Sequence, residues 1–233
     1  GVIMSALNTP PFLNVYKKDG SGWYDPNPFQ PSWENPIAYM EGPDQQSIDN
    51  QIFGTISADI KLLKNLVFKS NAGFDIYTHQ WDYYLDPVRT NYGRNLNGIG
   101  RSDKQHSMTY LWENTLTYKN SYGLHNLSAM GGSSIQQNTW HQTYIEGSDF
   151  PADVTVTTIN AANDVTGSTY QTQWAIASFF GQAAYDYNSK YYLTMTARYD
   201  GSSKLANPWG FMPSFSAGWR ISSEEFMKDI SFI

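Results

Sequence analysis

The chain of 233 residues contains no cysteine, so it has neither a disulfide framework nor a thiol-based site. It lacks any apolar run near the roughly 18 residues that a membrane-spanning helix needs, and no basic start followed by an apolar core marks a signal peptide. Charged residues make up only 15%, and the net charge of -6 argues against a nucleic-acid partner. A membrane barrel stays possible, because its strands alternate and never form a long apolar run.

Aromatic residues and glycine are abundant by comparison. Aromatic side chains make up 16% of the sequence, with 17 Tyr and 8 Trp, and there are 18 Gly. Aromatic side chains fit the pleated surface of a sheet, so this composition favours β-structure.

Residues 1–50 read as a long loop region, which we expect on the extracellular side. Pro10-Pro11, the DGSG of residues 19–22 and the DPNPFQP of residues 25–31 are strong turn and breaker signals. A loop this long inside a compact domain is uncommon unless it has a function.

From residue 51 to the end at 233 the sequence alternates between apolar and polar side chains. The runs last about 10 to 15 residues, which is longer than the 5 or 6 of typical soluble strands. We predict antiparallel strands at 51–60, 66–78, 106–119, 124–137, 173–187, 191–200 and 210–221. The fold class is therefore all-β.

The predicted connections alternate in length. Short turns at 61–65, 120–123 and 188–190 separate long connections at 79–105 and 138–172. Transmembrane barrels have this asymmetry, with short turns on one side of the membrane and long loops on the other.

The run from 191 to 200 shows what each side of such a strand would face. Tyr191, Met195 and Tyr199 share one side with other apolar residues, whereas Arg198 lies on the other. A charge on the lipid side near the bilayer midplane would cost roughly 2–4 kcal/mol, so we expect the polar side to line a wet lumen. The predicted lumen-facing residues are Lys69, Asp75, Glu113, Arg198 and Arg220.

A soluble β-sandwich could show the same division of polar and apolar sides. Its apolar sides would need a second layer to cover them, and the sequence offers no amphipathic helix for that purpose. Tyrosine and tryptophan at the strand ends, as at Tyr118, Tyr187 and Trp219, also suit the interfacial aromatic girdles of a membrane barrel.

The C-terminal third carries a recognisable signature. FFGQAAYDYNSKYYLTMTARYDGSS (residues 179–203) and WGFMPSFSAGWRISSEEF (residues 209–226), with KNLVFKSNAGFD earlier, resemble the barrel of the SusC/RagA family of TonB-linked outer-membrane proteins. The resemblance implies an importer of the bacterial outer membrane with a barrel of about 22 strands. This chain would supply about seven of them, with no plug domain, as a fragment of a longer protein that becomes ordered only within it.

The resemblance also implies partners and cargo. A SusD-like lipoprotein would act as a lid, and TonB would bind through an N-terminal part outside this sequence. The substrate would be an oligosaccharide or a peptide, and the apolar sides would contact the lipid bilayer. The alternative function is a soluble all-β carbohydrate-binding module.

No residue set indicates an enzyme, a metal site or a cofactor. The four histidines lie far apart in sequence, without metal-binding spacing. Aromatic residues of the long-loop side are the best binding candidates, because aromatic faces stack on sugar rings. The alternative is that these side chains pack the loops against each other or against the lid. These candidates are Trp81, Tyr83, Tyr84, Tyr92, Trp140, Tyr144 and Trp209.

Overall fold

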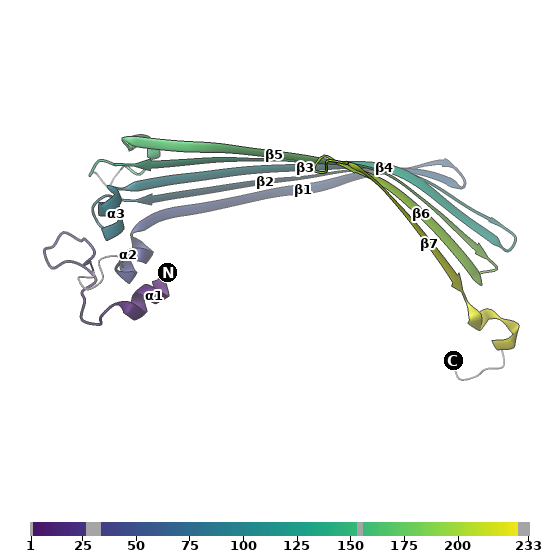
Figure 1. Ribbon diagram of the computed structural model, residues 1–233, viewed down its shortest axis with the longest axis horizontal. Coiled ribbons are helices and arrows are strands. Elements are labelled where there is room, and N and C mark those ends of the chain that lie inside the picture. The colour runs from purple at the N-terminus through teal and green to yellow at the C-terminus, as the bar shows by residue number, and fades with distance from the viewer. Residues whose placement is uncertain (1, 27–33, 153–155, 228–233) are drawn as a thin grey trace. The chain divides into compact units, whose positions relative to one another are not determined.

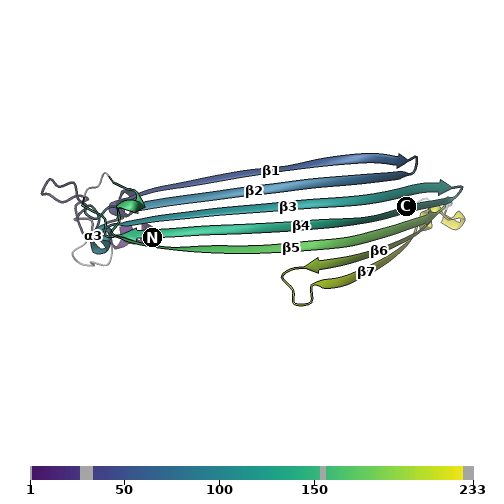
Figure 2. The ribbon, with the colours of Figure 1, turned by 90° about the horizontal axis from the view of Figure 1, so that it is seen from above.

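The computed structural model describes residues 2–26, 34–152 and 156–227. Seven strands form one sheet in chain order (Figures 1 and 2), which confirms the predicted all-β fold. The strands are β1 (Pro43–Leu63), β2 (Leu66–Leu85), β3 (Ile99–Tyr122), β4 (His125–Ser148), β5 (Asp164–Tyr187), β6 (Tyr191–Ser202) and β7 (Trp209–Trp219). The helices are α1 (Val2–Asn8), α2 (Pro36–Glu41) and α3 (Asn91–Leu96), with 3-10 turns at Ile159–Ala161, Ile221–Ser223 and Glu225–Met227.

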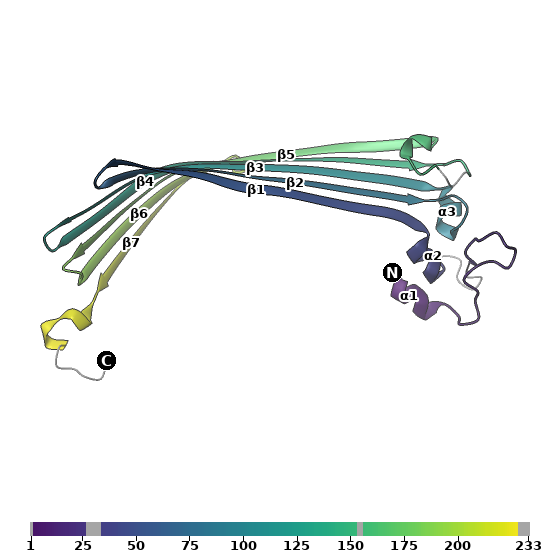
Figure 3. The same cartoon turned by 180° about the vertical axis from the view of Figure 1, so that it is seen from behind.

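The chain divides into two compact units that share strands β1 to β5. Unit 1 comprises Gly1–Gln51, Tyr77–His106 and Trp140–Gln171, and unit 2 comprises Ile52–Ile76, Ser107–Thr139 and Thr172–Ile233. The three helices belong to unit 1 (Figure 3). Each unit is described by itself.

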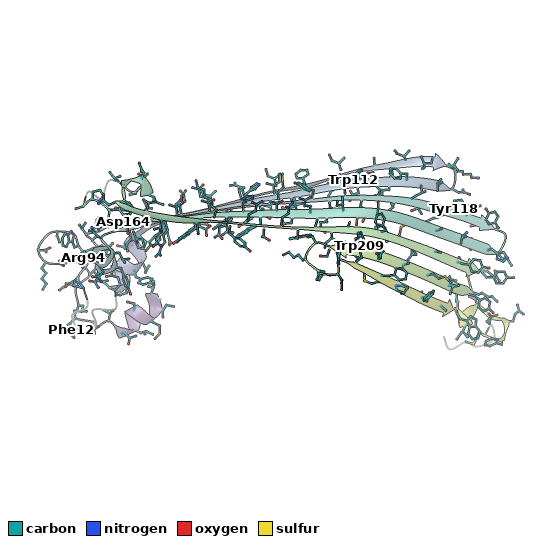
Figure 4. The ribbon with its side chains drawn as sticks, turned by 45° about the horizontal axis from the view of Figure 1, so that its top comes forward. Phe12, Arg94, Trp112, Tyr118, Asp164 and Trp209 are labelled. Atoms are coloured by element: carbon teal, nitrogen blue, oxygen red, sulfur yellow. The ribbon has the colours of Figure 1, made fainter. Side chains whose placement is uncertain are left out.

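In unit 2 the sheet has one apolar and one polar side. Antiparallel pairing places Met195 opposite Ala183 on β5 and Phe215 on β7, and Tyr191 opposite Tyr187 and Trp219. Directly paired residues share a side of the sheet, so an apolar row crosses β5, β6 and β7. Figure 4 shows the side chains standing on both sides of these strands.

Along most of β6 the apolar side is the more exposed of the two. Tyr191, Leu193, Met195 and Tyr199 are 46%, 40%, 45% and 43% exposed, whereas the intervening Tyr192, Thr194 and Thr196 are half-buried. No second layer of the described chain covers this side, which contradicts the sandwich arrangement.

Unit 1 has a small apolar core where the strands meet their connections. Tyr84, Leu85, Ile99 and Phe150 are all buried, and the rings of Tyr84 and Phe150 lie edge to face with their centroids 5.1 Å apart. This core fixes the connection 86–98, which contains α3, against the start of the connection that follows β4.

Five strands are longer than the sequence predicts. The five strands β1 to β5 have 20 to 24 residues each, so the predicted connections 79–105 and 138–172 shrink to 86–98 and 149–163. The added segment of β2, for example, mixes polar and aromatic residues on both sides, so hydrophobic alternation carries no signal there.

The first 50 residues contain more regular structure than a loop. Helices α1 and α2 form there, and β1 begins at Pro43 rather than at residue 51. Part of the breaker motif, residues 27–31, lies outside the described residues. None of the helices in the described ranges is long and apolar enough to cross a bilayer.

Candidate functional site

One side of the sheet in unit 1 brings aromatic and charged side chains together. The Arg101 guanidinium of β3 forms an ion pair with Glu146 of β4, with 2.8 Å between Nε and Oε2. The hydroxyl of Tyr144 donates to the same carboxylate oxygen at 2.7 Å. The Arg101 guanidinium also lies 5.9 Å from the centre of the Tyr83 ring, a cation–π distance. We call Tyr83, Arg101, Tyr144 and Glu146 the Arg101 cluster.

The Arg101 cluster holds its carboxylate in the charged form. The hydrogen bond from Tyr144, and then that from Arg101, lower the pKa of Glu146 below its usual range. The side chains of Arg101 and Glu146 are 37% and 34% exposed, so both stay within reach of a ligand.

Further side chains extend this side of unit 1. The rings of Trp81 and Tyr83 lie 5.6 Å apart on β2. Gln142 of β4 donates to both carboxylate oxygens of Asp103 on β3, at 3.0 and 2.8 Å. The Trp140 and Tyr170 rings of β4 and β5 meet edge to face at 5.5 Å.

Strand geometry explains why these residues meet. The turn between β3 and β4 contains Gly123 with φ of +60°, a conformation that glycine adopts without cost. Arg101 and Glu146 each lie 21 residues from the strand end at this turn, Tyr122 and His125 respectively. A regular antiparallel hairpin therefore brings them to opposing positions.

The loops of unit 1 add a hollow beside the Arg101 cluster. Its volume is about 310 Å³, and its lining includes Tyr39, Tyr83, Tyr92 and Arg101. Glu34 closes one wall and is only 4% exposed, because it accepts hydrogen bonds from the backbone N–H groups of Asn35 and Tyr92.

The structure separates the sequence-predicted aromatic candidates. Trp81, Tyr83, Trp140 and Tyr144 lie along the strands of unit 1 with partners described above. Tyr84 belongs instead to the buried core with Phe150. Tyr92 of α3 is 41% exposed and meets Tyr39 edge to face, with 6.4 Å between the ring centroids.

Trp209 has a different environment, in unit 2. Its ring stacks on Tyr199 at 4.8 Å and on Phe179 at 6.3 Å, both of which belong to the apolar row. A Cβ added at Gly201 would lie 2.8 Å from the Trp209 ring, so the indole covers the glycine directly. Trp209 is thus part of the apolar side of unit 2 (Figure 4).

The predicted lumen-facing residues all belong to unit 2. Arg198 donates to both carboxylate oxygens of Asp200 at 2.7 Å and to the buried Ser178 hydroxyl at 3.0 Å. Ser178 is paired directly with Asp200, which places these groups on the side opposite Met195.

The other predicted lumen residues have contacts of their own in unit 2. Lys69 and Asp59 form a loose ion pair at 3.8 Å, and the Arg220 guanidinium lies 5.6 Å from the centre of the Tyr192 ring. Asp75 and Glu113 are half-buried residues of β2 and β3.

Sequence reasoning missed Arg101, Asp103, Gln142 and Glu146. They lie in segments that alternation left as connections, and their partners are distant in sequence. Folding the predicted hairpin about Gly123 would have paired Arg101 with Glu146. The site places aromatic faces next to hydrogen-bond donors and acceptors, an arrangement that suits ligand recognition. Within the described ranges, no group of three or more His, Cys, Asp or Glu could hold a metal ion.

In unit 2, antiparallel strands joined in chain order carry an exposed apolar row on one side and polar side chains on the other. This is the pattern of a membrane β-barrel wall. Comparison with known proteins gives the family. The family described as "TonB dependent receptor-like, beta-barrel" matches residues 5–231, and the chain belongs to it. The chain is accordingly part of a protein of the bacterial outer membrane.

Relatives and solved structures agree with this assignment. TonB-dependent receptor P3 of Formosa agariphila is 32% identical over the whole of this chain, which covers 23% of that receptor. TonB-dependent receptor SusC of Bacteroides thetaiotaomicron is 26% identical over 90% of this chain and 21% of its own length. The chain thus spans less than a quarter of these curated relatives.

A solved structure shows the same fold. The RagAB peptide transporter matches 84% of this chain and 22% of its own chain, with a TM-score of 0.77 and 19% identity. The match covers the fold of the barrel segment, and the resemblance to SusC and RagA that the sequence motifs indicate is confirmed.

Proposed function

We propose that this chain forms part of the barrel wall and of the substrate-facing surface of a SusC-type TonB-dependent importer. The observation that carries the proposal is the exposed apolar row of unit 2. Its large side chains, such as Met195 and Phe215, are 45% and 71% exposed and lack a covering layer in the described chain. Hydrocarbon is the environment in which such a surface is stable.

The opposite side then borders the aqueous lumen. Arg198 and Asp200 lie there as a hydrogen-bonded pair, and Lys69, Asp75, Glu113 and Arg220 belong to the same polar set. A soluble carbohydrate-binding module is not favoured, because it would have to expose the whole apolar row to water.

The Arg101 cluster supplies a surface for substrate in this proposal. Trp81 and Tyr83 are both odd-numbered residues of β2, so strand alternation puts them on one side of the sheet in unit 1, next to Arg101, and we infer that this side faces the substrate. Aromatic rings with a charged pair and an amide suit either a sugar or a peptide, the two substrate classes that the family resemblance implies. Trp140 and Tyr144 extend the surface on β4.

The whole importer requires partners beyond this chain. A SusD-like lipoprotein would cover the lumen from outside, and TonB would supply energy through the N-terminal part of the receptor. Transport by such a protein involves no catalysis by these residues, and no described constellation suggests a reaction.

Uptake by the full-length receptor tests the proposal. We expect Trp81→Ala with Tyr83→Ala to lower substrate affinity about tenfold, a loss of about 1.4 kcal/mol, without changing the amount of folded barrel. Trp209→Ala serves as the matched aromatic control and should leave affinity unchanged. Equal affinity for the wild type and the double variant would remove these residues from the binding surface. Extraction of the wild-type receptor without detergent would contradict the barrel assignment itself.

A further inference from the structure

The hollow beside the Arg101 cluster has an apolar floor. It lies between α2, α3, the start of β1, the end of β2 and the start of β3 (Figure 1), all within unit 1. Leu85 and Ile99 are 5% and 4% exposed, and Ala38 is 1% exposed. Pro43 and Leu96 add further apolar surface to the lining. We call this space the α2–α3 hollow.

The more exposed part of the lining is aromatic. Tyr39 and Tyr92 are both exposed, and Tyr83 is half-buried. Leu96, near the end of α3, is 47% exposed and completes this part. Hydrophobic and aromatic side chains with a few polar groups are the usual lining of a ligand pocket.

Helix caps hold the walls of the α2–α3 hollow in place. The Asn35 side chain accepts a hydrogen bond from the N–H of Ile37 at 2.9 Å, where α2 starts. Thr90 accepts one from the N–H of Gly93 at 2.8 Å, where α3 starts. A Cβ added at Gly93 would clash with the backbone carbonyl of Asp86, so α3 packs tightly against the residues that precede it. Walls that are fixed in advance lower the entropic cost of binding a ligand.

Three polar side chains of the lining already have partners in the described chain. The Glu34 carboxylate accepts hydrogen bonds from two backbone N–H groups at 3.1 and 2.8 Å. The Thr90 hydroxyl caps α3, and the Arg101 guanidinium is paired with Glu146. A sugar ring in the hollow would bury several hydroxyls against the apolar floor, and a buried hydroxyl without a partner is unfavourable. An apolar group has no such requirement and is stabilised by its own burial.

We propose that the α2–α3 hollow binds one apolar side chain of a peptide substrate. The proposal rests on the proposed importer function and names a substrate class for it. The volume of about 310 Å³ is at the lower end of the roughly 300–1,000 Å³ of ligand pockets, so the hollow fits a side chain rather than a whole ligand. Tyr83 and Arg101 line the hollow and also belong to the Arg101 cluster. The donors and acceptors of that cluster can therefore bind the backbone amides of the same peptide.

Peptide binding by the purified full-length receptor in detergent tests the proposal. The probes are Gly-Gly-Leu-Gly-Gly, Gly-Gly-Ser-Gly-Gly and maltopentaose, each titrated by calorimetry. We expect the leucine peptide to bind at least tenfold more tightly than the other two, because full burial of a leucine side chain contributes more than the roughly 1.4 kcal/mol of a tenfold difference. Equal affinity for the two peptides, undetectable binding of both included, or tighter binding of maltopentaose would overturn the proposal.

Two variants of Leu96 locate the bound side chain. Leu96→Trp should fill the hollow and abolish the preference for the leucine peptide. Leu96→Ala should enlarge the hollow, so that Gly-Gly-Trp-Gly-Gly binds more tightly than the leucine peptide. Leu205→Trp is the matched control, because Leu205 lies in the connection between β6 and β7 and is 61% exposed. This variant should keep the preference of the wild type.

An undiminished leucine preference in Leu96→Trp would place the bound side chain elsewhere and contradict the proposal. A loss of folded receptor in that variant, together with an unchanged order of preference in Leu96→Ala, would mean that another part of the receptor fills the hollow. Detergent extraction and uptake by the Trp81 and Tyr83 double variant report separately on the importer function. That function stands if only the leucine preference fails.

Discussion

Strand β3 runs through both units, and the side chains that it carries differ in character between them. In unit 2 its even-numbered side chains include Tyr110, Trp112 and Leu116, which are 43%, 55% and 43% exposed. In unit 1 the even-numbered side chains are Ser102, Lys104 and His106. The backbone hydrogen bonds of a sheet do not depend on side-chain polarity, so β3 remains one continuous strand across this change.

The comparison also explains which parts of the fold the sequence predicts. In unit 2 one side of the strands is apolar and the other is polar, so the run from Tyr191 to Asp200 alternates cleanly, as its pairing with β7 shows. In unit 1 neither side of the strands is uniformly apolar. The segment from Thr78 to Leu85 mixes polar and aromatic residues on both sides, and hydrophobic periodicity cannot show that it is a strand.

The candidate site follows the same division. Aromatic composition singled out Tyr83 and Tyr144, but their charged partners Arg101 and Glu146 lie 45 residues apart and meet only through the hairpin. Tyr84 and Trp209 were grouped with the others by residue type alone. Their neighbours, Phe150 and Tyr199, show packing roles that only tertiary contacts define.

The largest expected effect comes from a charge placed in the apolar row of unit 2. Met195→Arg should destabilise the full-length barrel by about 2–4 kcal/mol, the cost of a basic residue near the bilayer midplane. Thr196→Arg, one residue further on the polar side, should cost far less. Urea titrations of receptor folded into lipid vesicles measure both. Equal costs would abolish the distinction between the two sides.

A smaller effect is expected from the ion pair of unit 1. Arg101→Gln, Glu146→Gln and the double variant form a double-mutant cycle. Because both side chains are about one-third exposed, we expect a coupling energy of up to about 1 kcal/mol. The same vesicle titration measures it, with Lys69 and Asp59 as the comparison pair. A coupling of several kcal/mol would indicate a pair that is buried by the rest of the receptor.

Glu224, which follows β7, should give unit 2 a pH-dependent contact. Hydrogen bonds from Tyr191, Lys190 and Trp219 lower the pKa of Glu224 to about 2. Since the folded-state pKa lies below the usual 4.5, the carboxylate stabilises the fold above pH 4.5 and loses this effect as pH falls towards 2.

Glu224→Gln tests this contact. The difference in unfolding free energy between wild type and variant should be constant from pH 8 to about 5 and should shrink below it. Denaturant titrations at a series of pH values measure the difference. A difference that grows on acidification would reverse the sign and contradict the ionised contact.

The smallest effect is expected for the loose ion pair on the polar side of unit 2. Lys69 and Asp59 are 52% and 61% exposed and 3.8 Å apart, so Lys69→Gln should change stability by less than about 0.5 kcal/mol. A circular dichroism melt of the receptor in detergent suffices to detect a larger change. Such a change would mean that Lys69 contacts another part of the full-length protein.

Which side of the unit 2 strands touches hydrocarbon can be measured directly. The chain has no cysteine, so a single introduced cysteine can carry a spin label in full-length receptor from which any cysteine elsewhere has been removed. The odd-numbered label positions are 193, 195 and 215, and the even-numbered positions are 194, 196 and 214. Each labelled receptor is held in lipid nanodiscs. We predict that labels in the odd-numbered set collide with dissolved oxygen and that labels in the even-numbered set collide with a water-soluble nickel chelate. The reverse pattern, or nickel access to both sets, would contradict this prediction.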